Sequence, residues 1–240
     1  MPDPPVAAEQ PAVWEDFIDI FYAPSAVFAR RERGSVWIPL LVVTLLMGGL
    51  FFINSGVLQP IMDAEFDRQM ALAMRSNPQM TPEMVERFRQ IGTRIGQIGI
   101  FIFGPLTIFA VGCLLWIVGK LVEAKQSFTA GLVVAAYSYV PRVLEGVVNG
   151  AQGLFLDPAQ LDGRFRLSLG PGRFLDPDTA SPLLLAILGR ADVFTIRVTV
   201  LLAIGLSVTG RISRTQAAIA AVIVWIVGAA PLIIQALRSM

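Results

Sequence analysis

Residues 95–119 read IGQIGIFIFGPLTIFAVGCLLWIVG and contain no charged side chain, although Arg94 and Lys120 stand directly at the two ends. An α-helix rises about 1.5 Å per residue, so about 20 residues cross the ~30 Å hydrocarbon core of a bilayer. This uncharged run of 25 residues is therefore long enough to span a membrane. The stretch predicts a transmembrane helix, and it sets the scale for the rest of the chain.

Four further runs have the same character. Of the 240 residues, 55% are hydrophobic and 15% are charged, against roughly a quarter charged in soluble domains. The first run has no charge between Arg33 and Asp63, and the last has none between Arg214 and Arg238. We predict an all-α polytopic membrane protein, a bundle of five transmembrane helices with an N-terminal interfacial amphipathic helix. The predicted spans cover about 36–59, 95–119, 128–156, 191–210 and 216–237.

The residues before the first span divide into two parts. Residues 1–12 are rich in Pro and Ala and predict a flexible tail, whereas residues 13–33 predict a cytoplasmic amphipathic segment before the membrane domain of residues 34–240. One face of this segment is apolar and the other acidic: Trp14, Phe17, Ile18, Phe21 and Tyr22 oppose Glu15, Asp16 and Asp19. An anchor in the membrane interface is favoured over a docking face for a partner, because aromatic residues next to spans commonly anchor.

The topology follows from the distribution of positive charge. The short connections 120–127 and 209–216 carry Lys120, Lys125, Arg211 and Arg214, a higher density of positive charge than the long connections. By the positive-inside rule they lie in the cytoplasm with the N-terminus, which leaves residues 60–94 and 157–190 outside. The odd number of spans then places the two termini on opposite sides.

Composition excludes several classes of function. A net charge of +1 argues against nucleic acid as a partner. Histidine is absent and Cys113 is the only cysteine, which excludes intramolecular disulfides, Cys-type zinc sites and His-based catalytic triads. No Walker A loop or dinucleotide fingerprint is present. We therefore expect no enzyme and assign no catalytic, cofactor-binding or metal-binding residue.

Two weaker metal signals have simpler readings. Five methionines in the first outer segment could offer thioethers to Cu(I), but packing on an amphipathic face is favoured: Met62, Met70, Met74, Met80 and Met84. Asp176 and Asp178 could touch calcium, but their spacing lacks a calcium-loop signature, so solvated turn residues are favoured.

A polar stripe runs down the third span. On a helix, Ser138, Arg142, Glu145, Asn149 and Gln152 share one face. A charge at mid-bilayer costs about 2.5–3.5 kcal/mol on insertion scales, so these side chains should face the bundle or water. If the third span begins at Phe128 and the fourth ends near Arg211, Arg142 and Arg197 lie at matching depths.

We therefore hypothesise an ion network that joins the third and fourth spans. Its members are Arg142, Glu145, Asn149, Asp192 and Arg197. Asp192 and Arg197 are five residues apart, about 140° around a straight helix, so both cannot point the same way without a bend. A structural role that holds the helices together is favoured over a substrate or proton path, because no second charged relay reaches the inner face.

Other positions predict helix breaks and close packing. Pro141 lacks an N–H group and should disrupt the helix one turn back, which frees the carbonyl group of Tyr137. Gly146 and Gly150, four residues apart, allow another helix backbone to approach closely.

Four segments carry a resemblance to a known family: FYAPSAVFARRERGSVWIPLL (21–41), FGPLTIFAVGCLLWIVGK (103–120), SFTAGLVVAAYSYVPRVL (127–144) and GRADVFTIRVTVLLAIGLSVTGRISRTQAA (189–218). With the pair Gly104–Pro105, the spacing from Tyr137 to Pro141, and Asp192 before Phe194, the chain resembles the bacterial branch of the Yip domain family. These are five-span membrane proteins first known as interactors of Ypt/Rab GTPases. Phe101, Ile102 and Phe103 stand where eukaryotic relatives have an aspartate before Gly-Pro, so GTPase binding is not carried over.

The resemblance implies a scaffold in the bacterial inner membrane. Its partners would be membrane lipids and other membrane proteins or further copies of itself, without a cofactor. The alternative is a small permease or channel subunit that uses the Arg142 and Glu145 layer, although an odd span count and the lack of a visible inverted repeat speak against it. The sequence names no transported small molecule.

Overall fold

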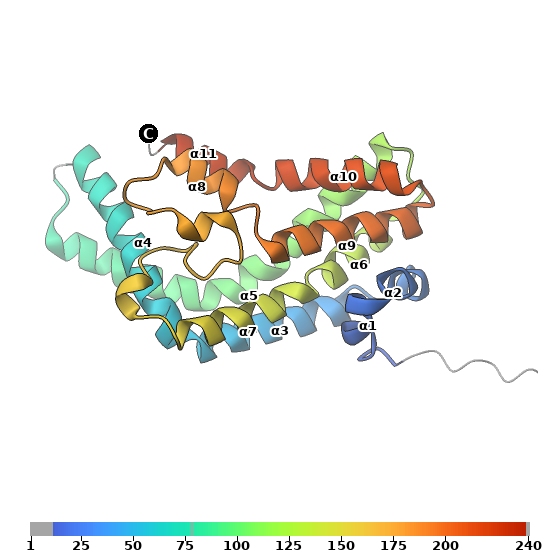
Figure 1. The fold of residues 1–240 in the computed structure, drawn as a ribbon, viewed down its shortest axis with the longest axis horizontal. Helices are drawn as coiled ribbons and strands as arrows, with labels where there is room; N and C mark the ends of the chain where they lie inside the picture. Colours follow the sequence, from blue (N-terminus) through green and yellow to red (C-terminus); the bar gives the residue numbers. More distant parts are fainter. Residues whose placement is uncertain (1–11, 78, 239–240) are drawn as a thin grey trace, which may run out of the picture.

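The protein is an elongated bundle of helices (Figure 1). The structure is a computed structural model that describes residues 12–77 and 79–238, and all regular secondary structure in these residues is helical. The predicted tail of residues 1–12 therefore lies, apart from its last residue, outside the described residues. The α-helices are α1 (Asp16–Tyr22), α2 (Pro24–Arg31), α3 (Trp37–Ile53), α4 (Ser55–Ser76), α5 (Pro82–Leu121), α6 (Phe128–Ser138), α7 (Val140–Gly153), α8 (Pro182–Leu188), α9 (Val193–Gly210), α10 (Arg214–Val227) and α11 (Ala230–Arg238).

Within the described residues, four helical stretches are long and apolar enough to cross a bilayer: Pro82–Leu121, Phe128–Gly153, Val193–Gly210 and Arg214–Leu237. A fifth is formed by α3 and α4 if the bent pair is one span. The all-α membrane fold expected from the sequence is confirmed, and the five predicted runs correspond to these five stretches.

The first stretch is bent in a way that hydropathy does not reveal. Helix α3 ends at Ile53, before the predicted boundary at residue 59, and α4 leaves at 83° to it. Asn54 sits at the bend with φ −87° and ψ 9°, and its Nδ2 atom donates to the carbonyl oxygen of Gly146 at 2.8 Å. Pro60 follows in the second turn of α4, where it cannot donate a helical hydrogen bond. The bend turns α4 across the end of the bundle.

The second and third stretches show the end signals expected from the sequence. Thr81 caps α5 by accepting from the backbone N–H of Met84 at 3.3 Å, and the helix continues for 40 residues through Pro105. The third stretch is broken at Tyr139, and Pro141 lies in the first turn of α7. A proline at this position needs no N–H partner, so the break comes just before it.

Two short helices precede the bundle and pack against it. The buried residues Ile20, Val27 and Phe28 belong to the same apolar core as residues of α6 and α9. Trp14, Ile18 and Tyr22 are exposed, which leaves the apolar face expected in the membrane interface. Asp16 differs from the prediction, because it is completely buried instead of lying on the solvent face.

The connections gather at two ends of the molecule. Figure 1 shows the α5–α6 and α9–α10 turns and α2 toward one end, and α4 with residues 157–188 toward the other. This groups residues 60–94 with 157–190, the two segments predicted to lie outside; which end faces the cytoplasm stays a prediction. Residues 157–188 contain two 3₁₀ turns, Pro158–Gln160 and Pro171–Phe174, and α8 in place of the expected turns and short strands.

Candidate functional site

The predicted ion network is centred on an arginine and a glutamate of α7. The Nη1 atom of Arg142 lies 2.6 Å from Oε2 of Glu145, three residues later on the same helix. About a fifth of each side chain is exposed, 22% and 21%. Positions three apart on a helix lie on one face, so this pair follows directly from the spacing.

Arg142 also reaches the neighbouring helix α9. Its Nη2 atom donates to the hydroxyl oxygen of Thr195 at 2.8 Å. The guanidinium group has donors on two sides, so it can bind a carboxylate and a hydroxyl group at once. The third and fourth spans are thus joined through Thr195, a residue that the charge pattern did not suggest.

Asp192 is linked to this pair through Thr195. Its Oδ1 atom accepts from the backbone N–H groups of Phe194 at 2.8 Å and Thr195 at 3.3 Å, and so caps α9. Its Oδ2 atom accepts from the hydroxyl group of Ser168 and the N–H group of Leu169, both at 2.8 Å. We call the connected residues Glu145, Arg142, Thr195 and Asp192 the α7–α9 polar layer. Asp192 is only 4% exposed, and these four donors explain how it can be buried.

The other two predicted members lie elsewhere. Arg197 donates through Nη2 to the carbonyl oxygen of Phe21 at 2.8 Å, on the last turn of α1. This separation matches the angle of about 140° between Asp192 and Arg197 around α9. The Oδ1 atom of Asn149 is buried, and no donor in the described part of the chain reaches it. The break at Tyr139 also splits the expected stripe, and Gln152 bonds to Leu167 and Arg173.

Arg190, just before α9, is a further charge near the layer. Its Nη2 atom donates to the carbonyl oxygen of Trp225 at 2.9 Å, and its guanidinium group lies 5.6 Å from the centre of the Trp225 ring. Burial and the positive charge of Arg142 lower the pKa of Arg190. These contacts tie the start of α9 to α10.

A second set of charges joins the N-terminal helices to the bundle. The carboxylate of Asp16 accepts from Nε of Arg30 and from Nε of Arg31, both at 2.6 Å, and from the hydroxyl group of Tyr137 at 3.1 Å. We call Asp16, Arg30, Arg31 and Tyr137 the N-terminal ion cluster. Sequence reasoning missed it; the adjacent arginines directly after the amphipathic segment were the available signal.

The residues predicted to allow close packing occupy different surroundings. A Cβ atom added to Gly150 would lie 2.2 Å from Oδ1 of Asn54, so α3 and α7 meet there at a distance that only glycine permits. At Gly146 the nearest atom would be Cδ1 of Leu50 at 3.1 Å. Gly104 has open space around its Cα atom, and Pro105 beside it lies within continuous helix.

Three cavities in the described residues are lined by other groups. Two apolar grooves of about 410 and 430 Å³ lie along α5 and between α1, α3 and α7, and neither is lined by Arg142 or Glu145. A third of about 280 Å³ lies among α4, residues 163–182 and α11. The α7–α9 polar layer borders none of the three, so its chemistry in this structure is hydrogen bonding between helices.

Comparison with known proteins gives one family and one relative. The family model described as the Yip1 domain matches residues 18–234. The chain is also similar to the membrane protein YknW of Bacillus subtilis (strain 168), with 27% identity over 220 residues, which cover 91% of this chain and 87% of that protein. No solved structure matches the chain significantly.

Proposed function

Because the chain belongs to the Yip1 domain family, we propose that it is a non-enzymatic scaffold of the bacterial inner membrane, with its N-terminus in the cytoplasm. Its role would be to organise membrane protein partners or further copies of itself. The likeness to a protein described as a membrane protein supports the location in a membrane.

The observation that carries the proposal is the way in which Arg142 is bound. Its guanidinium group contacts Glu145 on α7 and Thr195 on α9, and Asp192 caps the helix that carries Thr195. A transport site needs charged groups that face a cavity and exchange partners during a cycle. Here the charged groups hold two helices together, which favours a fixed bundle over a pathway.

Purification from native membranes tests the proposal. The full chain, tagged and expressed at its natural level, should be recovered in mild detergent with a membrane protein in a fixed ratio or as a defined oligomer. A five-span membrane protein carrying the same tag is the control for adventitious capture. Recovery as a monomer without a partner in a fixed ratio contradicts the scaffold.

Reconstitution separates the scaffold from the permease. Vesicles that contain the purified protein should hold a membrane potential and entrapped ions as well as empty vesicles do. A leak that disappears in the Glu145→Gln variant would instead establish a pathway through the α7–α9 polar layer. The two experiments are independent, because a scaffold is tested by its partners and a permease by its flux.

A further inference from the structure

The third cavity, of about 280 Å³, has a composition unlike that of the two apolar grooves. It lies between α4, the segment around residues 163–182, and α11. Three arginines and two carboxylates stand in its wall: Arg68, Arg164, Arg166, Glu65 and Asp178. The charges in the wall therefore leave one positive charge in excess.

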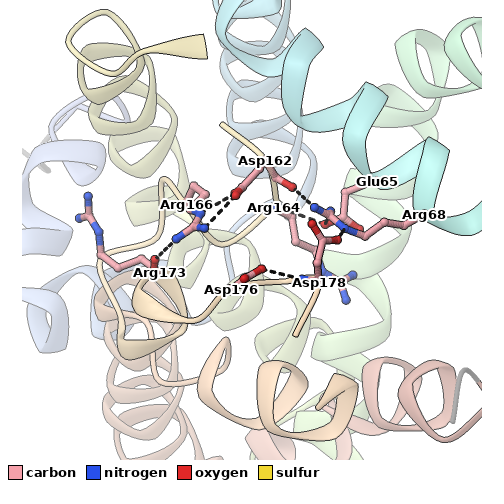
Figure 2. A network of polar contacts seen from close by, with 8 residues as sticks. All are labelled: Glu65, Arg68, Asp162, Arg164, Arg166, Arg173, Asp176 and Asp178. Carbon is pink, nitrogen blue, oxygen red and sulfur yellow. Dashed lines mark hydrogen bonds and ion pairs between the residues drawn. The ribbon is translucent and has the colours of Figure 1, made fainter. Parts of the chain in front are cut away.

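A network of polar contacts holds this wall in place (Figure 2). Arg68 on α4 pairs through Nε with Asp178 at 2.6 Å and donates through Nη2 to the carbonyl oxygen of Asp162. Arg166 binds both carboxylate oxygens of Asp162, and Arg166 with the nearby Arg68 lowers the pKa of that carboxyl group. The backbone N–H of Arg164 donates to Glu65 at 3.2 Å. The loop is thus fixed to α4 by side chains from both.

Two guanidinium groups in this wall retain unused donors. The Nη1 atom of Arg68 is buried without a hydrogen-bond partner in the described residues, although Glu65 Oε1 lies 3.5 Å away. The side chain of Arg164 is exposed and makes no hydrogen bond or ion pair with any described residue; its guanidinium carbon lies 5.0 Å from the centre of the Phe165 ring. Guanidinium donors in a fixed position favour planar or tetrahedral oxyanions, above all phosphate and carboxylate.

The remaining wall of the cavity is apolar. Leu72 of α4, Phe165, Leu175 and Leu185 of α8 take part in it. The volume is at the lower end of the range for small-molecule sites, roughly 300–1,000 Å³, so it admits a small head group and not a whole amphiphile. The cavity also lies at the end of the membrane-spanning helices, where lipid head groups are found.

We propose that this cavity binds the phosphate group of a membrane phospholipid, with Arg164 and Arg68 as its donors and the apolar wall next to the start of the acyl chains. Phosphate in solution has the same oxyanion chemistry, and only the lipid also uses the apolar wall. The site is separate from the α7–α9 polar layer and does not depend on the scaffold role.

The chain contains a matched control for Arg164. The tripeptide Gly-Arg-Phe occurs at residues 163–165 and again at 172–174. Arg173 also lies near the following aromatic ring, 5.9 Å from the centre of Phe174, but its Nη1 atom is bound to Gln152 at 3.1 Å. Arg173 does not line the cavity. The two arginines thus share charge and local sequence, and only one has donors directed to the cavity.

The test measures lipid binding to the full chain in detergent micelles. Phosphatidylglycerol is titrated and binding is followed by the rise in unfolding temperature and by native mass spectrometry. Arg164→Gln should weaken binding about tenfold, the loss expected for one charge-assisted hydrogen bond, whereas Arg173→Gln should leave it unchanged. Equal weakening by both variants, or binding that does not saturate, overturns the proposal.

Two further arms make the outcome specific. Asp178→Asn removes the carboxylate that competes for Arg68 and should tighten binding, so the proposal does not depend on loss of function alone. Inorganic phosphate is added as a competitor: failure to displace the lipid at millimolar concentration supports the lipid as the source. Displacement at equal concentrations instead assigns the oxyanion site to a soluble phosphate and overturns the lipid.

Discussion

The N-terminal ion cluster and the α7–α9 polar layer use charge in the same bundle under different conditions. In the first, a completely buried carboxylate, Asp16, receives donors from two arginines and from Tyr137. In the second, Arg142 and Glu145 are each about one fifth exposed and lie on the same helix. The first joins segments 121 residues apart, whereas the ion pair of the second is local.

This difference teaches where charge carries the larger structural consequence. Breaking a buried ion pair leaves an uncompensated charge and typically costs about 3–5 kcal/mol, whereas exposed pairs contribute about 0–1 kcal/mol. The layer lies between these limits. We therefore expect the cluster that attaches two short helices outside the spans to be more sensitive to substitution than the layer within the membrane.

Asp16→Ala should have the largest effect. It leaves Arg30 and Arg31 close together without the carboxylate that binds both, so the free energy of unfolding should fall by about 3–5 kcal/mol. Denaturation by dodecyl sulfate in mixed micelles measures this change. Limited proteolysis should also cut before Trp37 in this variant, because α1 and α2 lose their attachment to α6.

The matched control for this variant is Asp19→Ala. Asp19 pairs with the same Arg30 at 2.6 Å, but its side chain is 37% exposed. Its removal leaves Arg30 bound to Asp16 and should cost at most about 1 kcal/mol. Equal losses in the two variants would show that burial does not distinguish the two carboxylates.

Tyr137→Phe asks how much of the cluster depends on the bundle. The variant removes one hydrogen bond to a buried carboxylate and should cost about 1.5–3 kcal/mol, while Asp16 keeps both arginines. The comparison variant is Tyr139→Phe, since the hydroxyl group of Tyr139 makes no hydrogen bond within the described residues. A cost in Tyr139→Phe as large as that in Tyr137→Phe contradicts the assignment of the hydroxyl group to Asp16.

The membrane fold could be predicted from the sequence because the length of an apolar run is a local property. The runs from Trp37 to Met240 needed only a count of uncharged residues against the bilayer thickness. The bend at Asn54 could not be found in this way, because Asn and Gly carry no charge and do not interrupt the count. Its signals were Asn54 itself and Pro60, and they report backbone geometry instead of hydropathy.

The partners of the charged groups were harder to predict for a different reason. The α7 pair follows from helix periodicity, but Asp16 was placed on the solvent face because periodicity treats every carboxylate as exposed. Its burial depends on Tyr137, which no local pattern links to it. Thr195 was missed because threonine hydroxyl groups in helices usually bind their own backbone, as Thr199 does.

Glu145→Gln tests the layer at its ion pair. The amide keeps a hydrogen-bond acceptor for Arg142 but loses the charge, and the partly exposed site lies between the surface and buried limits, so we expect a loss of about 1–2 kcal/mol. Glu86→Gln is the control, because Glu86 and Arg89 form a pair of the same spacing at 3.9 Å with Glu86 59% exposed. That variant should lose a few tenths of a kcal/mol, roughly the worth of a surface pair.

Thr195→Val should have the smallest effect and is the sharpest test of the link between α7 and α9. Valine has the shape of threonine, and Arg142 keeps Glu145, so the expected loss is about 0.5–1.5 kcal/mol. Thr199→Val removes a hydroxyl group that donates to the carbonyl oxygen of Thr195 within its own helix, and it should be close to neutral. Combined with Glu145→Gln, Thr195→Val should cost more than the sum of the two single variants, because Arg142 then loses both partners. Additive losses would mean that the two contacts act independently, and the layer would then be two separate contacts instead of one connection between the helices.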